Sequence, residues 1–304
     1  MKSFSYIKYT KLWFAISGLL ILAGMGGMVN NKIQTGHYLK LGIDFTGGTV
    51  MEVQFPDYNG DASTSIKEVV NGIEEGLLAQ ITVTDKETYL IQTKNLSDEQ
   101  YESIKAGFVQ NIGPNEEIRY NTIGPKIGET LKRKAFVALS IAMIAIVLYI
   151  AYAFRHIPKH VSAWRFGVCA IIALIHDVLV VLGLFALFNL EVDAFFITAL
   201  LTIMGFSVHD TIVVFDRIRE NLRHQGRNDT FGDVADISLR QTMSRSINTS
   251  VSTLITLAAL YIWGAESIKL FTLALIAGII VGTYSSIFIA SPVLTLWQEA
   301  KRLR

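Results

Sequence analysis

Charged residues are scarce in this sequence. Asp, Glu, Lys and Arg make up 17% of its 304 residues, whereas about a quarter is usual for a soluble domain. The mean hydropathy of +0.40 excludes a disordered chain and argues against an ordinary soluble enzyme. Charge of one sign is not in excess, because 27 basic and 26 acidic residues give a formal net charge of +1. The charge balance therefore gives no indication of a nucleic-acid partner.

Cysteine and proline are also rare. The one cysteine, Cys169, lies in an apolar run, so no disulfide can form within the chain. In such surroundings we expect an inert thiol. The chain has 5 prolines and no low-complexity segment.

Long apolar runs are what the sequence has in abundance. Hydrophobic residues make up 51% of the chain, and its mean hydropathy is +0.40. Six stretches approach or exceed the roughly 20 residues that cross a bilayer as a helix. They are residues 12–29, 135–154, 166–188, 194–215, 246–263 and 268–297. The sequence therefore predicts an α-helical polytopic membrane protein.

The first apolar stretch has some features of a signal peptide. It follows Lys2, Lys8 and Lys11, but it is long for the apolar region of a signal. It ends in several glycines, without a clear A-x-A cleavage site. We expect a retained membrane anchor.

Basic residues predict the orientation of the chain. They cluster at the N-terminus, between spans two and three, between spans four and five, and in the tail, whereas the short loops 189–193 and 264–267 have none. This alternation places both termini and the loop 216–245 in the cytoplasm and residues 30–134 outside. The basic residues concerned are Lys2, Lys8, Lys11, Arg155, Lys159, Arg165, Arg217, Arg219, Arg223, Arg227, Arg240, Arg245, Lys301, Arg302 and Arg304.

Residues 30–134 have the pattern of a folded α+β domain inserted between spans one and two. Alternation over 49–55 predicts a half-buried strand, and further strands are expected at 81–84, 88–93 and 116–123. Asp85-Lys86-Glu87 would join the second and third strands. Possible capping boxes at 65–68 and 97–100 would open two helices. The order β-α-β-β-α-β is that of a ferredoxin-like unit.

No catalytic signature is visible in this domain. We find no nucleophile–base pair, no metal-ligand cluster and no phosphate loop, so we expect no enzyme and no cofactor. Gly47 and Gly48 lack the Gly-Lys-Ser/Thr ending of a P-loop. They more plausibly allow a tight turn or a close backbone approach beside a strand.

Ionisable residues lie where lipid should be. The third span contains His176 and Asp177, and the fourth contains His209 and Asp210. Such a residue at the centre of a membrane helix costs about 2.5–3.5 kcal/mol on insertion scales. The fifth span begins at Arg245 and continues with a polar stripe on one helical face, which we expect to point to the bundle interior or a wet cavity. The stripe consists of Asn248, Thr249, Ser252, Thr253 and Thr256.

Two interpretations of these residues remain open. In the first, Asp210 binds and releases a proton, Arg245 pairs with the ionised carboxylate, and His209 and Asp177 share the relay. In the second, the cluster only fixes helix register. His209 would then be an interior hydrogen-bonding residue, and Arg245 would snorkel to water.

Two other features receive a structural interpretation. Gly278 and Gly282 form a GxxxG pattern in the last span, which we interpret as close helix packing inside one bundle rather than a dimer contact. The loop 216–245 has nearly balanced charges and is expected to be a solvated or interfacial helical loop.

Four blocks of sequence closely resemble the SecF family, within the resistance–nodulation–division superfamily. They are GIDFTGGT at 42–49, GPKIG at 124–128, GFSVHDTIVVFDRIREN at 205–221 and SRSINTS at 244–250. The first block contains Asp44, Gly47 and Gly48, and the third contains Asp216 and Arg217. The third block is highly specific, whereas the first is shared in looser form with SecD proteins.

The resemblance carries expectations about fold and function. It implies a six-helix bundle with segments 1–29, 30–134 and 135–304, and an accessory subunit of the bacterial Sec translocase in the cytoplasmic membrane. SecD and SecYEG would be its partners, a YajC-like subunit is possible, and unfolded exported polypeptides would be its substrates. Proton conduction, which drives late-stage export in the family, would fall to Asp210 and Arg245. No nucleic acid is expected.

The resemblance also shows one departure and leaves rivals open. His209 stands where many relatives carry Asn, which could add a titratable group beside Asp210. His176-Asp177 matches a recurring pair of the third span. The first rival function is a proton-coupled exporter of lipid or small molecules. The second is a non-transporting assembly scaffold that uses the charged cluster for packing.

Overall fold

The computed structural model describes residues 5–58, 60–85, 88–155, 163–224, 226 and 229–302. From the predictions above, Lys2, Lys86, Glu87, Lys159, Arg227 and Arg304 lie outside these residues. The chain divides into two compact units. Unit 1 comprises Met1–Lys40 and Val137–Arg304, and unit 2 comprises Leu41–Phe136.

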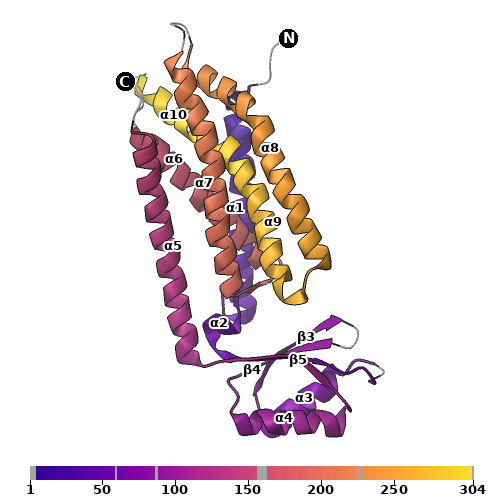
Figure 1. The fold of residues 1–304 in the computed structure, drawn as a ribbon. Helices are drawn as coiled ribbons and strands as arrows, with labels where there is room; N and C mark the ends of the chain where they lie inside the picture. The colour runs from indigo at the N-terminus through magenta and orange to yellow at the C-terminus, as the bar shows by residue number, and fades with distance from the viewer. Residues whose placement is uncertain are drawn as a thin grey trace. The chain divides into compact units, whose positions relative to one another are not determined.

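Unit 1 is built of long helices (Figure 1). They are α1 (Thr10–Thr35), α5 (Pro125–Ala153, which begins in unit 2), α6 (Ala163–Leu187), α7 (Ala194–Arg223), α8 (Phe231–Trp263), α9 (Lys269–Ser285) and α10 (Ser291–Arg302). Short elements are the 3-10 turns η1 (Ile7–Tyr9) and η2 (Glu266–Ile268), the π-helical turn η3 (Ser286–Ala290), and the two-residue strands β1 (Lys40–Leu41) and β6 (Glu191–Val192). Among the described residues, six helices are long and apolar enough to cross a membrane. The prediction of six spans is therefore confirmed.

The helices are longer than the predicted spans. α1 continues to Thr35, beyond the expected end at residue 29. Most of the expected loop 216–245 belongs to α7 and α8, which leave only residues 224–230 between them. In the last span, the π-helical turn η3 separates α9 from α10. The spans were predicted to end where charged residues interrupt the apolar runs. The helical backbone hydrogen bonds continue beyond these charged residues, so the helices are longer than the apolar runs.

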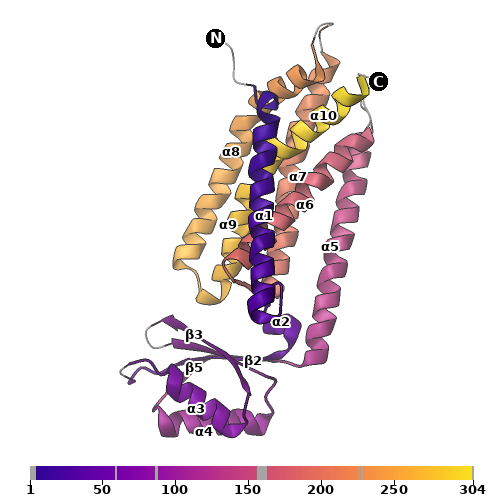
Figure 2. The ribbon, with the colours of Figure 1, turned by 180° about the vertical axis from the view of Figure 1, so that it is seen from behind.

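Glycines set the closest helix contacts in unit 1. α1 lies beside α6 (Figure 2), where a Cβ on Gly24 would come within 2.5 Å of the Gly183 Cα. A Cβ on Gly278 in α9 would lie 2.2 Å from the Ile203 Cδ1 of α7. The interpretation of the GxxxG pattern as packing within one bundle is therefore confirmed. Cys169 is fully buried in the same core.

In its described residues, unit 2 is a four-stranded antiparallel sheet with two longer helices and one helix of four residues. Its elements are α2 (Ile43–Thr46), β2 (Gly48–Gln54), α3 (Ser63–Ile73), β3 (Leu78–Asp85), β4 (Thr88–Thr93), α4 (Asp98–Asn111) and β5 (Glu116–Ile123). The strand order is β3-β4-β2-β5, with β2 paired to both β4 and β5. This is the ferredoxin-like topology that the element order predicted.

The core of unit 2 follows the predicted periodicities. Met51, Val53 and Phe55 are buried on one side of the sheet, where Ile66 of α3 and Ile104 of α4 join them.

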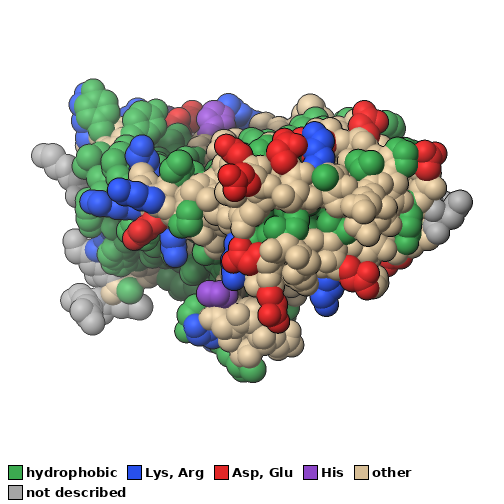
Figure 3. Space-filling model, turned by 90° about the horizontal axis from the view of Figure 1, so that it is seen from below, with side chains coloured by type: hydrophobic (Ala, Val, Ile, Leu, Met, Phe, Trp, Pro, Cys, Tyr) green, Lys and Arg blue, Asp and Glu red, His purple; other side chains and the backbone are tan. Residues whose placement is uncertain are grey.

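Acidic side chains are visible on the surface in Figure 3. Those exposed on α3 and α4 include Glu68, Glu99 and Glu102.

One of the two predicted capping boxes is correct. Ser97 accepts from the Gln100 backbone N–H, and the Gln100 side chain accepts from Ser97. The predicted box at 65–68 is wrong, because α3 begins two residues earlier, at Ser63. Asp61 accepts from the Ser63 backbone N–H at 2.9 Å and satisfies that end of the helix instead.

The two glycines of the block at 42–49 each lie close to another part of unit 2, Gly47 to the segment that leaves the unit and Gly48 to the end of β4. Gly47 has φ +74°, and a Cβ there would lie 2.7 Å from the Pro125 Cα. Gly48 has φ +131°, and its Cβ would lie 2.7 Å from the Thr93 carbonyl oxygen. A Cβ on Gly128 would in turn approach the Gly47 nitrogen to 2.9 Å. The first and last segments of unit 2 therefore form one tight joint, as the expected close backbone approach requires.

Candidate functional site

Asp210 is buried in the middle of α7. Its side chain is 7% exposed, and its Oδ1 accepts a hydrogen bond of 2.5 Å from the Ser246 hydroxyl of α8. Its Oδ2 is buried and has no hydrogen-bond partner among the described residues. A buried carboxylate oxygen without a donor is costly in an apolar environment.

Hydroxyl groups connect this carboxylate to α9. Ser250, one helical turn after Ser246, donates to the Ser246 carbonyl oxygen at 2.9 Å. The Ser250 hydroxyl also lies 2.5 Å from the Thr283 hydroxyl. We call Asp210, Ser246, Ser250 and Thr283 the Asp210 site.

Arg245 and His209 lie beside the Asp210 site on the outside of this chain. Both side chains are exposed. Within the described residues, no ion pair of 4.0 Å or less joins Arg245 to Asp210. The carboxylate instead accepts a hydrogen bond from Ser246. The sequence analysis expected Arg245 to pair with ionised Asp210, and this conformation contains no such pair.

The polar stripe of the fifth span is exposed, contrary to prediction. Arg245, Asn248, Thr249, Ser252 and Thr256 are exposed on the outer surface of α8, whereas Thr253, the remaining member of the stripe, is half-buried. α7 contributes a second exposed stripe of polar and small residues, and Arg217 of α7 donates to Gln241 of α8 at 2.6 Å. We call the two stripes together the α7–α8 polar face. Its α7 members are Thr198, Thr202, Gly205, His209, Asp216 and Glu220.

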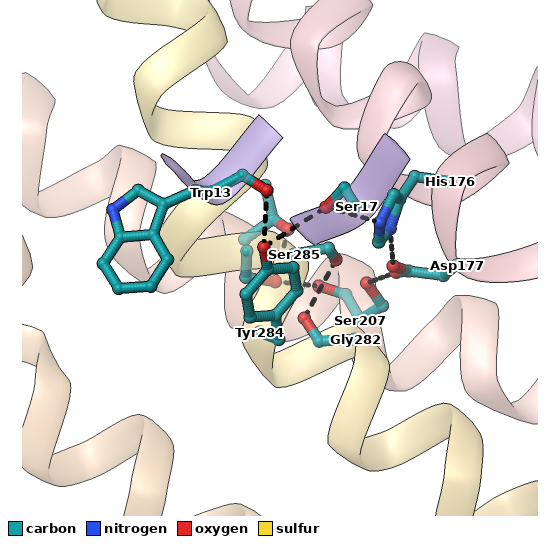
Figure 4. Close-up of polar contacts among 10 residues, drawn as sticks. Trp13, Ser17, His176, Asp177, Ser207, Gly282, Tyr284 and Ser285 are labelled. Atoms are coloured by element: carbon teal, nitrogen blue, oxygen red, sulfur yellow. Dashed lines mark hydrogen bonds and ion pairs between the residues drawn. The ribbon is translucent and has the colours of Figure 1, made fainter. Parts of the chain in front are cut away.

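A second acid, Asp177, lies in a closed hydrogen-bonded network. The His176 Nδ1 lies 3.0 Å from the Asp177 Oδ1, and the Ser207 hydroxyl donates to the Asp177 Oδ2 at 2.6 Å. The His176 Nε2 lies 3.0 Å from the Ser17 hydroxyl of α1. Both oxygens of Asp177 therefore have partners (Figure 4), whereas only one oxygen of Asp210 has a partner among the described residues.

The network continues from α1 to α9. The Ser17 hydroxyl donates to the Tyr284 hydroxyl at 3.2 Å, and Tyr284 donates to the Trp13 carbonyl oxygen at 2.8 Å. Figure 4 shows Tyr284 placed between these two groups. We call Trp13, Ser17, His176, Asp177, Ser207 and Tyr284 the Asp177 network. Ser286 of η3 donates to the Ser207 carbonyl oxygen and lies within hydrogen-bond distance of the Thr211 hydroxyl. Both contacts are with α7, the helix that carries Ser207 of the Asp177 network and Asp210 of the Asp210 site.

The remaining predicted residues lie away from these clusters. Asp44 is half-buried in the first turn of α2. Asp216 forms an ion pair with Arg219, and Arg217 pairs with Glu220 at 2.5 Å. Among the described residues, no group of three or more His, Cys, Asp and Glu could hold a metal ion.

Comparison with known families identifies the chain. Residues 104–300 match the family described as protein export membrane protein SecD/SecF, C-terminal, and residues 39–55 match the SecD/SecF GG motif. The chain belongs to the SecD/SecF family. The GG motif covers Asp44, Gly47 and Gly48, and the larger match covers Asp177, Asp210 and Arg245.

Relatives in the SecD/SecF family match over most of their length. A protein translocase subunit SecF of Thermobaculum terrenum is 43% identical, covering 88% of this chain and 87% of the relative. The corresponding subunit of Anaerolinea thermophila is 39% identical, covering 95% and 92%. SecDF from Thermus thermophilus, a translocon-associated membrane protein of known structure, is 31% identical, with a TM-score of 0.80 over 97% of this chain. The match spans only 39% of that SecDF chain.

Sequence analysis did not single out four residues of these two clusters. Ser246 and Ser250 are four residues apart and share a helical face, but the more numerous polar residues of the neighbouring stripe drew the prediction. Ser17 and Tyr284 are isolated polar groups in apolar helices. No sequence signal linked them to His176.

Proposed function

We propose that this chain is an accessory subunit of the bacterial Sec protein translocase. It works with SecD in the cytoplasmic membrane and uses the proton motive force to assist the late stage of polypeptide export. Its role is transport rather than bond-making catalysis. The energy is adequate, because one charge crossing 100 mV is worth about 2.3 kcal/mol.

The observation that carries the proposal is the state of Asp210. A buried carboxylate with one unpartnered oxygen, inside a membrane helix, is suited to bind and release a proton. The exposed Arg245 and His209 flank it on the α7–α8 polar face. Such a face is poorly suited to lipid, so it supports association with a polar membrane partner. We assign this partner as SecD.

The finer elements of the proposal follow the family resemblance. Both termini lie in the cytoplasm, and unit 2 lies outside, where it meets the emerging polypeptide. SecYEG supplies the channel, and a YajC-like subunit is a further partner. Proton passage at Asp210 is coupled to movement of the outer units of this chain and SecD.

The test is export of a reporter precursor into sealed vesicles that contain SecD, SecYEG and this chain. Export is measured with and without an imposed proton gradient, at matched protein levels. We expect Asp210→Asn to abolish the acceleration that the gradient gives. Glu129→Gln, which changes an exposed acid of α5 outside the α7–α8 polar face, serves as control and should retain it.

Other results would favour the rival functions. If Asp210→Asn responds to the gradient as the unchanged chain does, Asp210 is not the coupling site, and a packing or scaffold role is favoured. If loss of the chain leaves secretion normal but alters resistance to drugs or lipid composition, a small-molecule or lipid exporter is favoured.

A further inference from the structure

We propose that the side chains of His176 and Asp177 together hold two protons. A neutral imidazole beside an ionised carboxylate would hold only one. With two protons, every hydrogen bond of the Asp177 network runs in a single direction. The inference goes beyond the proposed function, because it concerns a second proton-holding site and does not depend on Asp210. It rests on which groups in the network are able to donate.

The direction is set at the Trp13 end of the network. A carbonyl oxygen only accepts, so the 2.8 Å contact between Trp13 and Tyr284 consumes the single proton of the Tyr284 hydroxyl. In the 3.2 Å contact between Ser17 and Tyr284, Ser17 must therefore be the donor. The single proton of Ser17 is consumed there. Only the His176 Nε2 remains to donate in its 3.0 Å contact with Ser17.

The other end of the network requires a second proton. The 3.0 Å contact between the His176 Nδ1 and the Asp177 Oδ1 needs one proton between the two atoms. Ser207 donates its own proton to the Asp177 Oδ2. The pair then carries one proton on Nε2 and one shared between Nδ1 and Oδ1. It is neutral overall, either as imidazolium and carboxylate or as imidazole and carboxylic acid.

The surroundings favour a neutral pair. His176, Asp177, Ser17 and Ser207 are all buried. The groups that contact the pair from other helices are Ser17 of α1 and Ser207 of α7, while Tyr284 of α9 is the nearest further titratable group in the network. Among the described residues, no Lys or Arg forms an ion pair with Asp177. A net charge here would therefore be buried without a counter-ion, which is costly.

Loss of the Nε2 proton would remove one of the hydrogen bonds between α1 and α9. The bare Nε2 would then accept, and the Ser17 hydroxyl would turn to donate to it. The bond from Ser17 to Tyr284 would lose its proton and with it one of the two hydrogen bonds by which α1 holds Tyr284. His176 thus acts as a positioning residue whose proton content decides how α9 is held against α1.

The test measures the His176 nitrogens directly. The full-length chain, labelled with ¹⁵N-histidine and reconstituted with SecD in lipid at neutral pH, is studied by solid-state NMR. His176→Gln, which deletes the His176 signals, provides the assignment. We expect the shift of a protonated nitrogen at Nε2, together with a second proton on Nδ1 or on the Asp177 carboxyl, whose side-chain carbon is read in a sample labelled with ¹³C-aspartate. A protonated Nε2 beside an unprotonated Nδ1 and an ionised carboxylate would overturn the second proton. An unprotonated Nε2 in the unchanged chain would overturn the proposal.

A tyrosine variant tests the direction of the network. In Tyr284→Phe, Ser17 loses its acceptor and becomes free to donate to Nε2, so the fraction of unprotonated Nε2 should rise. Tyr149→Phe, at an exposed tyrosine of α5, should leave the His176 signals unchanged, as should Asp210→Asn. If Tyr284→Phe also leaves them unchanged, the network does not fix the proton. These readouts require no export activity, so they are separate from the test of the proposed function.

Discussion

At the scale of single residues, the two buried acids of the bundle differ in how completely their oxygens are bonded. Asp177 has a partner for each oxygen, from His176 and Ser207. Asp210 has one donor, Ser246, and one buried oxygen without a described partner. A fully bonded group favours one arrangement, whereas an incompletely bonded one leaves room for exchange. This difference supports Asp210 rather than Asp177 as the site that changes during transport.

We expect the Ser246 hydroxyl to be needed for gradient-driven export. Ser246→Ala removes the only described donor to Asp210, and a hydrogen bond to a charged group is worth about 1.5–3 kcal/mol. We expect gradient-driven export to fall by about tenfold or more, since 1.4 kcal/mol corresponds to a factor of ten. Ser244→Ala, at an exposed position of the same helix outside the polar stripe, is the control. Equal behaviour of the two variants would remove Ser246 from the Asp210 site.

Gly47 should be intolerant of a side chain. Its positive φ costs a non-glycine residue about 1–2 kcal/mol, and the contact with Pro125 adds overpacking of about 1–3 kcal/mol. We expect Gly47→Ala to speed hydrogen exchange in β2 of the full-length chain. Gly72→Ala in α3, where a Cβ meets nothing within 4 Å, should leave exchange unchanged or slower. Identical exchange in both variants would contradict the tight joint.

At the scale of elements, α8 shows how a membrane helix can face three environments. Ser246 and Ser250 are buried against neighbouring helices, while Ile247, Val251 and Ile255 are exposed and apolar. The polar stripe from Arg245 to Thr256 is exposed on another face. Only a partner other than lipid would satisfy that stripe.

Cross-linking should therefore distinguish two faces of α8. A photoreactive maleimide attached at Thr249→Cys is expected to form an adduct with co-expressed SecD. The same probe at Ile255→Cys lies six residues further along the helix, and so on a different side. It should label lipid instead. A SecD adduct at Ile255→Cys alone would show that the α7–α8 polar face is not the contact.

The α1–α6 pair depends on the absence of side chains. Gly24 and Gly183 let the backbones approach closely, and Asn31 donates to the Ala186 carbonyl oxygen at 2.8 Å. We expect Gly24→Leu to separate the helices and to lower the midpoint of thermal aggregation in detergent. Gly26→Leu, where a Cβ meets no atom within 4 Å, is the matched control. Equal midpoints would show that this contact contributes little to stability.

At the scale of the whole molecule, the orientation of the chain is open to a direct experiment. Cys169 is buried, and Cys169→Ser gives a background without cysteine. We expect an impermeant maleimide to label Lys105→Cys of unit 2 in intact cells. Glu220→Cys, at the end of α7, should be labelled only after permeabilisation. The reverse pattern would invert the predicted topology.

The sequence by itself determined the elements that periodicity encodes. Six apolar runs of membrane length specified the helices, and alternation over residues 49–55 specified the central strand, because lipid and a half-buried sheet each impose a local pattern. The four blocks of resemblance also gave the family. The prediction of a capping box at 65–68 was wrong, because a local sequence pattern does not show at which of several neighbouring residues a helix begins.

Tertiary structure alone decided which polar side chains meet. The sequence placed Asp210 and Arg245 on neighbouring spans, but it did not show that Ser246 holds the carboxylate while Arg245 faces outward. Nor did it link Ser17, His176 and Tyr284, which lie on three helices far apart in the chain. Helical periodicity tells which residues share a face, whereas the rotation of each helix depends on packing against its neighbours. Contacts such as Gly24 against Gly183 set that rotation, and they exist only in the folded bundle.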